Sequence, residues 1–216
     1  MSETLGKIEK PEAADFRLCR KLIFVPLVLL PPSNDTELTS LIQQYWDDAT
    51  EQVNKLAGTF DGIKKIFHEL VPAGESGLAA IAHISAGSQD LVKTIAECGA
   101  TLEETEDPET LIEFLDWGRC LSLRLESPIV FNEVYKNYAQ AQQKRDEAIS
   151  KKIDESLKND ELGLVLLREE HRAQFPSDIQ VLYVSPPSLD AIMRYMRDKF
   201  GKSPQEADNP ADKTKE

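Results

Sequence analysis

Two of the three histidines stand beside glutamates at the ends of apolar runs, where an imidazole and a carboxylate could act together. His68 and Glu69 lie in the stretch FHEL, and His171 lies in the stretch REEH. A nearby acidic stretch, LEETEDPE, adds Glu103 and Glu104. Imidazole and carboxylate groups are common ligands of divalent metals. These five residues are therefore the candidate catalytic set, and His68, His171 and Glu103 are the candidate metal ligands.

The same residues have a second interpretation that needs no metal. Histidines and acids at strand ends often alternate between inward-facing and outward-facing positions. The two histidines are also far apart in the chain, so they offer no local ligand spacing. On this interpretation we expect no cofactor, and a bound divalent metal is the alternative.

Other stretches that could bind a ligand lack essential parts. The glycine-rich stretch GESG (74–77) has no Walker lysine, and Leu78 stands where a nucleophile elbow needs its second glycine. Two Pro-Pro-Ser corners, at 31–33 and 186–188, follow apolar runs. Proline has no N–H to offer an anion, so both corners predict helix starts rather than ligand sites.

Four short stretches follow one another in the order of a known motif set: KIFH, LEE, KRDEAI and REEH. In these stretches the chain resembles the TraB/Tiki/erythromycin-esterase-like hydrolases, which implies a metal-dependent hydrolase. That family has a glycine three residues before each histidine. Here Lys65 and Arg168 replace both glycines, so the backbone geometry of such a site does not carry over. The resemblance covers short islands only, and it does not assign the chain to the family.

Composition restricts the classes of partner. The chain has 216 residues, 41% of them hydrophobic, and a formal net charge of −13. Such a charge opposes binding to nucleic acid or to an anionic membrane surface, and no apolar run reaches membrane-spanning length. Three cysteines without a C-x-x-C pair are typical of a reducing compartment, so we expect a cytoplasmic protein.

Alternating strand and helix patterns predict an α/β fold with a central mixed or mostly parallel sheet of about five strands flanked by helices. We expect strands at 21–30, 63–71, 100–104, 162–168 and 179–185. The near-continuous apolar run of the first of them suits a strand buried on both faces, but Pro26 favours an edge position or a bulge. A single helix is expected over 74–99. One α/β domain should span 16–200, between a flexible N-terminus (1–15) and a disordered tail (201–216).

The longest predicted helix runs from about 129 to 158, roughly 45 Å at 1.5 Å per residue. Its ends carry the apolar clusters Ile129–Tyr138 and Ala148–Leu157, and its middle, QQKRDE, is charged. If one cluster packs on the sheet and the other on a second copy, the protein is a homodimer. In the competing interpretation both clusters pack on the chain's own sheet while the charged middle faces water.

The sequence contains no complete catalytic motif, so it leaves open whether the protein is an enzyme. The acidic surface and the long helix favour a non-catalytic domain that binds another protein or itself, with neither nucleic acid nor a membrane as partner. The alternative is a metal-dependent hydrolase with a His/Glu site at the strand ends.

Overall fold

A five-stranded, fully parallel sheet lies at the centre of the computed structural model, which describes residues 19–30 and 34–200. The strands are β1 (Arg20–Pro26), β2 (Ile63–His68), β3 (Thr101–Glu103), β4 (Leu162–Leu167) and β5 (Ile179–Tyr183), in the order β3-β2-β4-β1-β5. The predicted α/β class, with about five strands and one long helix, is confirmed. The termini predicted at 1–15 and 201–216 both lie wholly outside the described residues.

The helices are α1 (Thr36–Gly58), α2 (Gly74–Ile84), α3 (Ala86–Glu97), α4 (Pro108–Ser122), α5 (Pro128–Ser156) and α6 (Pro187–Phe200). The single helix expected over 74–99 is in fact two helices. Ser85 separates them with an extended backbone, φ −152° and ψ 93°. Helical spacing of apolar residues continues across this break, so the sequence pattern does not reveal it. Helix α6 begins at Pro187, as the second Pro-Pro-Ser corner predicted, whereas Pro31 and Pro32 lie outside the described residues.

Strand β1 is a central strand buried on both faces, as its near-continuous apolar run predicted, rather than the edge strand that Pro26 alone would favour. It pairs with β4 on one side and with β5 on the other, and all seven of its residues are buried. Pro26 is the last residue of the strand, so its missing N–H leaves the hydrogen bonds of the preceding strand residues intact. Strand β4 is equally buried. Strands covered on both faces carry near-continuous apolar sequence, which is the pattern both of these strands show.

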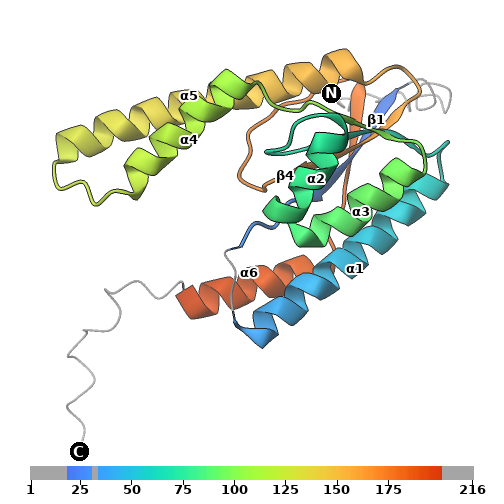
Figure 1. Ribbon diagram of the computed structural model, residues 1–216, viewed down its shortest axis with the longest axis horizontal. Coiled ribbons are helices and arrows are strands. Elements are labelled where there is room, and N and C mark those ends of the chain that lie inside the picture. The colour runs from blue at the N-terminus through green and yellow to red at the C-terminus, as the bar shows by residue number, and fades with distance from the viewer. Residues whose placement is uncertain (1–18, 31–33, 201–216) are drawn as a thin grey trace, which may run out of the picture.

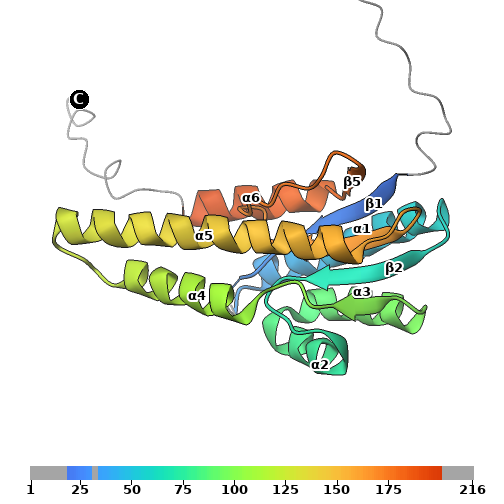
Figure 2. The same ribbon diagram turned by 90° about the horizontal axis from the view of Figure 1, so that it is seen from above.

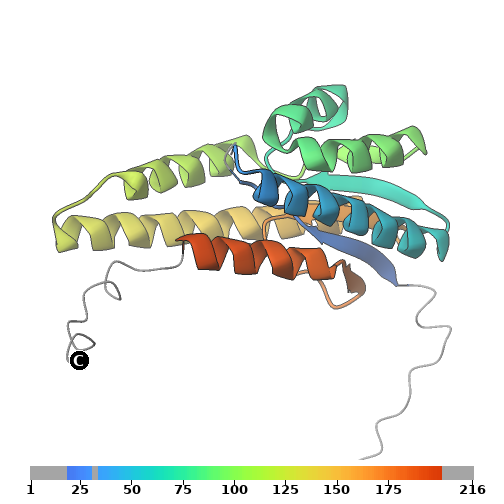
Figure 3. The ribbon, with the colours of Figure 1, turned by 90° about the horizontal axis from the view of Figure 1, so that it is seen from below.

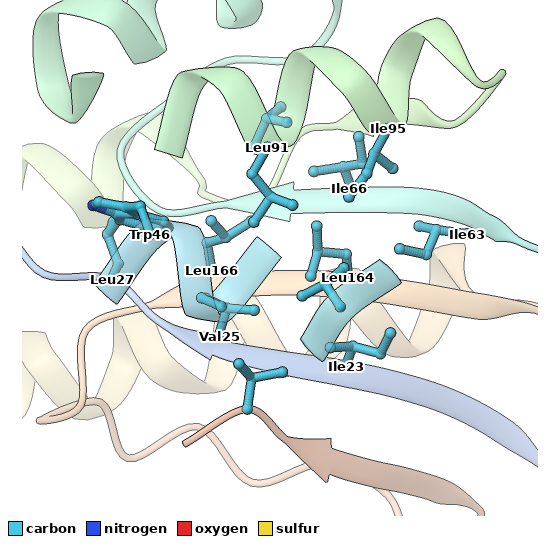
Figure 4. Close-up of a cluster of buried hydrophobic side chains, with 14 of the residues drawn as sticks. Ile23, Val25, Leu27, Trp46, Ile63, Ile66, Leu91, Ile95, Leu164 and Leu166 are labelled. Carbon is cyan, nitrogen blue, oxygen red and sulfur yellow. The ribbon is translucent and has the colours of Figure 1, made fainter. Parts of the chain in front are cut away.

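Two apolar layers hold helices on opposite faces of the sheet. Ile23 and Val25 of β1 face the layer formed with α1, α2, α3 and α6, as the close-up in Figure 4 shows for part of it. Leu22 and Phe24 alternate onto the other face, where α5 covers the sheet. Figure 3 shows α1 and α6 on one side with α5 behind them, and Figure 2 shows α5 on the near side.

Helices α4 and α5 pack against each other as a hairpin whose free end extends past the sheet (Figures 1 and 2). Ile149, Ile153 and Leu157 attach the C-terminal part of α5 to the sheet. The other apolar cluster of this helix, Ile129–Tyr138, contains no buried residue. The chain's own sheet therefore covers one of the two apolar clusters and leaves the other without a sheet to pack on.

A close approach between α3 and α1 gives a stability prediction. A Cβ added at Gly87 would lie 2.0 Å from Cδ1 of Trp46, a buried ring that also contacts Tyr45 edge-on. We expect Gly87→Ala to destabilise the protein by about 1–3 kcal/mol in urea unfolding, because a packed ring has to move. Gly58→Ala is the control, since nothing lies within 4 Å of its added Cβ. It should be neutral or stabilising, because alanine is the better helix former. Equal effects of the two variants would contradict the prediction.

Candidate functional site

The candidate site lies at the carboxyl edge of the sheet, where parallel α/β sheets usually bind ligands. Glu69 directly follows β2, Arg168 directly follows β4, and Glu106 lies between β3 and α4. Helix α5 crosses this edge at Arg145, between its sheet-bound part and the free half of the hairpin. Four charged side chains from four separate segments thus converge at one place.

These four side chains form a buried ion network. Arg145 donates from Nε to Glu106 Oε2 at 2.6 Å and from one terminal nitrogen to Glu106 Oε1 at 2.6 Å. The same nitrogen donates to Glu69 Oε1 at 2.7 Å. Arg168 donates to Glu69 from its backbone N–H at 2.7 Å and from Nε at 2.8 Å. The Phe114 ring covers Arg145, with its centre 4.8 Å from the guanidinium carbon. Paired arginine and carboxylate forks of this kind are strong and directional.

The network keeps Arg145 and Glu69 ionised although both side chains are almost completely buried. The side chains of Arg145, Glu69 and Glu106 are at most 4% exposed. Burial alone would lower the pKa of Arg145, but hydrogen bonds and charge from Glu106 and Glu69 outweigh it and raise that pKa. Burial alone would raise the pKa of Glu69, but Arg145 and Arg168 outweigh it and lower that pKa. Two cations and two anions therefore balance inside the protein.

His68 is sealed beneath this network rather than open to a ligand. Its side chain is fully buried, and burial lowers its pKa, so the ring is neutral. Nδ1 lies 2.7 Å from the carbonyl oxygen of Glu69, which makes Nδ1 the protonated nitrogen. Nε2 lies 3.0 Å from Ser88 Oγ, which also lies 3.0 Å from the carbonyl oxygen of Ser85. Both ring nitrogens are occupied within the protein.

His171 and Asp146 stand at the solvent side of the network. His171 is half-buried and packs on Phe24, with ring centres 4.9 Å apart, and it lines a hollow of about 500 Å³ with Tyr183. Its Nδ1 accepts from the Ala173 N–H at 3.1 Å. Burial lowers the pKa of His171, so the neutral ring carries its proton on Nε2. Burial raises the pKa of Asp146, which is 3% exposed.

The structure brings together only part of the candidate set. His68, Glu69 and His171 lie at the carboxyl edge, whereas Glu103 pairs with Lys65 and Glu104 lies 3.0 Å from Lys152 Nζ. Within the described residues, no group of three or more histidine, cysteine, aspartate or glutamate side chains is arranged to hold a metal ion. The metal site therefore stays a prediction without a geometric counterpart here.

Sequence reasoning missed the centre of the network. Arg145 stands on the helical stripe that includes Tyr138, Ala141 and Ala148, at spacings of three and four residues. A charged residue at a core-facing position needs a buried partner, and this was the available signal. The acidic stretch 102–109 was recognised. Its buried acid is Glu106, whereas the candidate set contains Glu103 and Glu104 from that stretch.

Comparisons of the chain with protein-family models, with curated proteins and with solved structures found no match. The resemblance of its short motifs to a hydrolase family thus remains a prediction. Among the described residues, no helix is both long and apolar enough to cross a membrane. The site must be interpreted from its own geometry.

The two depressed histidine pKa values predict loss of stability in acid. Because the pKa of His68 lies below its ordinary 6.5 in the folded protein, the unfolded chain binds more protons as the pH falls. Stability should be fully present above pH 6.5 and decrease below it, and His171 acts in the same direction. We expect the urea midpoint of His68→Asn to fall less between pH 8 and pH 5.5 than that of the wild type. The difference between the urea midpoints of the two proteins at pH 8, where the histidine is neutral, reports the change in packing alone. Parallel curves for the two proteins would refute the assignment.

Proposed function

We propose that the protein is a self-associating interaction domain that forms a homodimer through the free end of the α4–α5 hairpin. The proposal rests on a group of exposed apolar side chains at that end, which we call the tip patch: Leu123, Ile129, Val130 and Phe131. Ile129 is 81% exposed and Leu123 is 62% exposed. Grouped apolar exposure of this kind marks interaction surfaces far more often than isolated exposed residues do.

The hairpin cannot bury this surface by itself. Phe114 is the one fully buried residue among the fifteen of α4, and the first buried residue of α5 is Ala141, thirteen positions after its start. A helix needs an apolar layer to pack against, and two helices side by side provide each other with a single narrow seam. Further apolar residues on α4, Ile112 and Leu115, also remain exposed. A second layer of helices would cover both sets.

Charge balance favours a second copy of the chain as that layer. Two chains of net charge −13 repel each other over most of their surfaces. Residues 112–136 carry four acids and three bases, so this segment has a net charge of only −1. The hairpin is therefore a surface on which two copies can approach without strong repulsion. Two of its three bases, Arg119 and Arg124, can then face the acids of the other copy.

The geometry suits a two-fold four-helix arrangement. Helix α5 has 29 residues and is about 43 Å long, so its free half offers several helical turns beyond the sheet. Two hairpins packed antiparallel would bury both tip patches in one closed assembly. The ion network around Arg145 fastens α5 at the sheet edge, which sets the direction in which the hairpin projects.

Sedimentation of the full-length protein tests this proposal. We expect a dimer at about 100 µM that dissociates progressively toward a monomer of 24.3 kDa over a hundredfold dilution. The midpoint of that transition gives the dissociation constant. A single monomeric species at every concentration would contradict the proposal and leave the tip patch to a different protein.

The metal-dependent hydrolase is supported less well by the same geometry. His68 would have to break its Ser88 contact to bind an ion through Nε2, and Glu69 would have to leave two arginines. Metal analysis of protein purified without an affinity tag distinguishes the two functions. Stoichiometric zinc, manganese or iron that is lost in a His68→Ala, His171→Ala double variant would favour the hydrolase.

A further inference from the structure

A groove of about 760 Å³ runs between α5 and the loop that follows β4. From α5 it is lined by Lys136, Gln143, Asp146 and Glu147, among others, and from the loop by Arg172 and Gln174. It lies at the carboxyl edge of the sheet, beside the ion network and outside the tip patch. Neither the proposed dimer nor the candidate metal site uses it.

Asp146 lies in the groove wall, and one of its two carboxylate oxygens has no hydrogen-bond partner in the described part of the chain. Its Oδ2 accepts a hydrogen bond from the Arg172 N–H at 3.1 Å. Its Oδ1 is buried and has no hydrogen-bond partner, the one such side-chain atom among the described residues. A buried carboxylate oxygen without a donor is costly, and such an atom in the wall of a groove is a place where a ligand can supply the donor. Gln143 and Arg172, which flank it in the groove, are exposed and can rotate aside.

The surrounding charges call for a cationic donor. Arg145 and Arg168 direct their hydrogen bonds to Glu69 and Glu106, so neither arginine donates to Asp146 Oδ1. Glu147 adds a second acid at the same end of the groove. A primary ammonium group would provide both the N–H donors and the missing counter-charge.

The rest of the groove suits a polar chain that ends in an anion. Lys136 lies ten residues before Asp146 on α5, which is about 15 Å along the helix. Four residues of extended peptide span about 13–14 Å. Gln140 and Gln143 line the groove between these two positions, and each primary amide can both donate to and accept from peptide groups. We propose that the groove binds a short peptide with a free N-terminus, whose ammonium group contacts Asp146 and whose carboxylate lies toward Lys136.

Calorimetric titration of the full chain with tetra-alanine tests the proposal. We expect a dissociation constant below about 1 mM for the free peptide. The N-acetylated peptide should bind at least tenfold more weakly, because acetylation removes the ammonium charge. The C-terminal amide should bind several-fold more weakly, because Lys136 loses its carboxylate. Both peptide controls use the unaltered protein, so they hold even if a variant fails to fold.

Asp146→Asn should weaken binding of the free peptide at least tenfold while keeping an oxygen that accepts from the Arg172 N–H. Glu147→Gln removes the same charge at an exposed position of the same groove and should cost less than threefold. Equal binding of tetra-alanine and its acetylated form would overturn the ammonium site. So would an Asp146→Asn variant that binds the free peptide as tightly as the wild type does. Absence of heat up to about 10 mM peptide would overturn it as well. An amide that binds as tightly as the acid would overturn the assignment of the Lys136 end.

Discussion

Replacing Arg145 by methionine is expected to lower the free energy of unfolding by about 3–5 kcal/mol, the largest effect of any single change considered for this protein. Methionine retains much of the side-chain volume but removes the cation between Glu69 and Glu106. Among the described residues, Glu106 then keeps only the hydrogen bond donated by the Leu70 N–H, at 2.9 Å. The cost arises from leaving a buried carboxylate without its counter-ion rather than from losing a favourable pair. Urea unfolding followed by circular dichroism measures the loss.

Lys144→Met is the matched control, since it makes a similar change one position earlier. Lys144 Nζ lies 2.9 Å from Glu113, but both side chains are largely exposed, and pairs of that kind contribute little to stability. Adding Glu106→Gln to Arg145→Met should recover part of the stability, because it removes one stranded charge. Equal losses for Arg145→Met and Lys144→Met would show that the network contributes nothing particular to the fold.

Replacing Ile129 and Phe131 together by glutamine is expected to raise the dimer dissociation constant at least a hundredfold. Burial of one such side chain stabilises by about 1.5–3 kcal/mol, and two-fold symmetry removes each contact twice. A hundredfold change requires only about 2.7 kcal/mol. Both side chains are exposed in the single chain, so the unfolding free energy of the monomer should stay nearly constant. Sedimentation over the same dilution series gives the dissociation constant.

The control for this experiment is a double variant at exposed apolar positions outside the hairpin, Tyr183→Gln with Met193→Gln. Tyr183 is on β5 and Met193 is on α6, and both are at least half exposed. This variant removes exposed apolar surface of the same kind without touching the tip patch, so it should dimerise like the wild type. If both double variants weaken association equally, the contact does not depend on the hairpin.

Local pattern was enough to predict the elements of this fold. Strand β1 and strand β4 are continuous apolar runs, and helical spacing marks α1 and α5 over most of their lengths, because periodicity reports which face of an element is buried. The apolar–charged–apolar division of α5 was visible in the same way. So were the acidic stretch 102–109 and the two histidines beside acids.

Only the tertiary structure determines which of those elements pack against one another. Arg145 pairs with Glu69 across 76 positions of sequence, and Arg168 pairs with Glu69 across 99. Such contacts depend on the strand order, and no local periodicity encodes which strands become neighbours. The same order placed Pro26 at the end of a central strand rather than on an edge. Glu103 and Glu104 pair with Lys65 and Lys152 instead of joining the histidines. The length of α5 was readable from the sequence. That Arg145 and Asp146 in its charged middle are buried at the sheet edge, while its apolar N-terminal half projects beyond it, follows from how far the sheet extends beneath the helix.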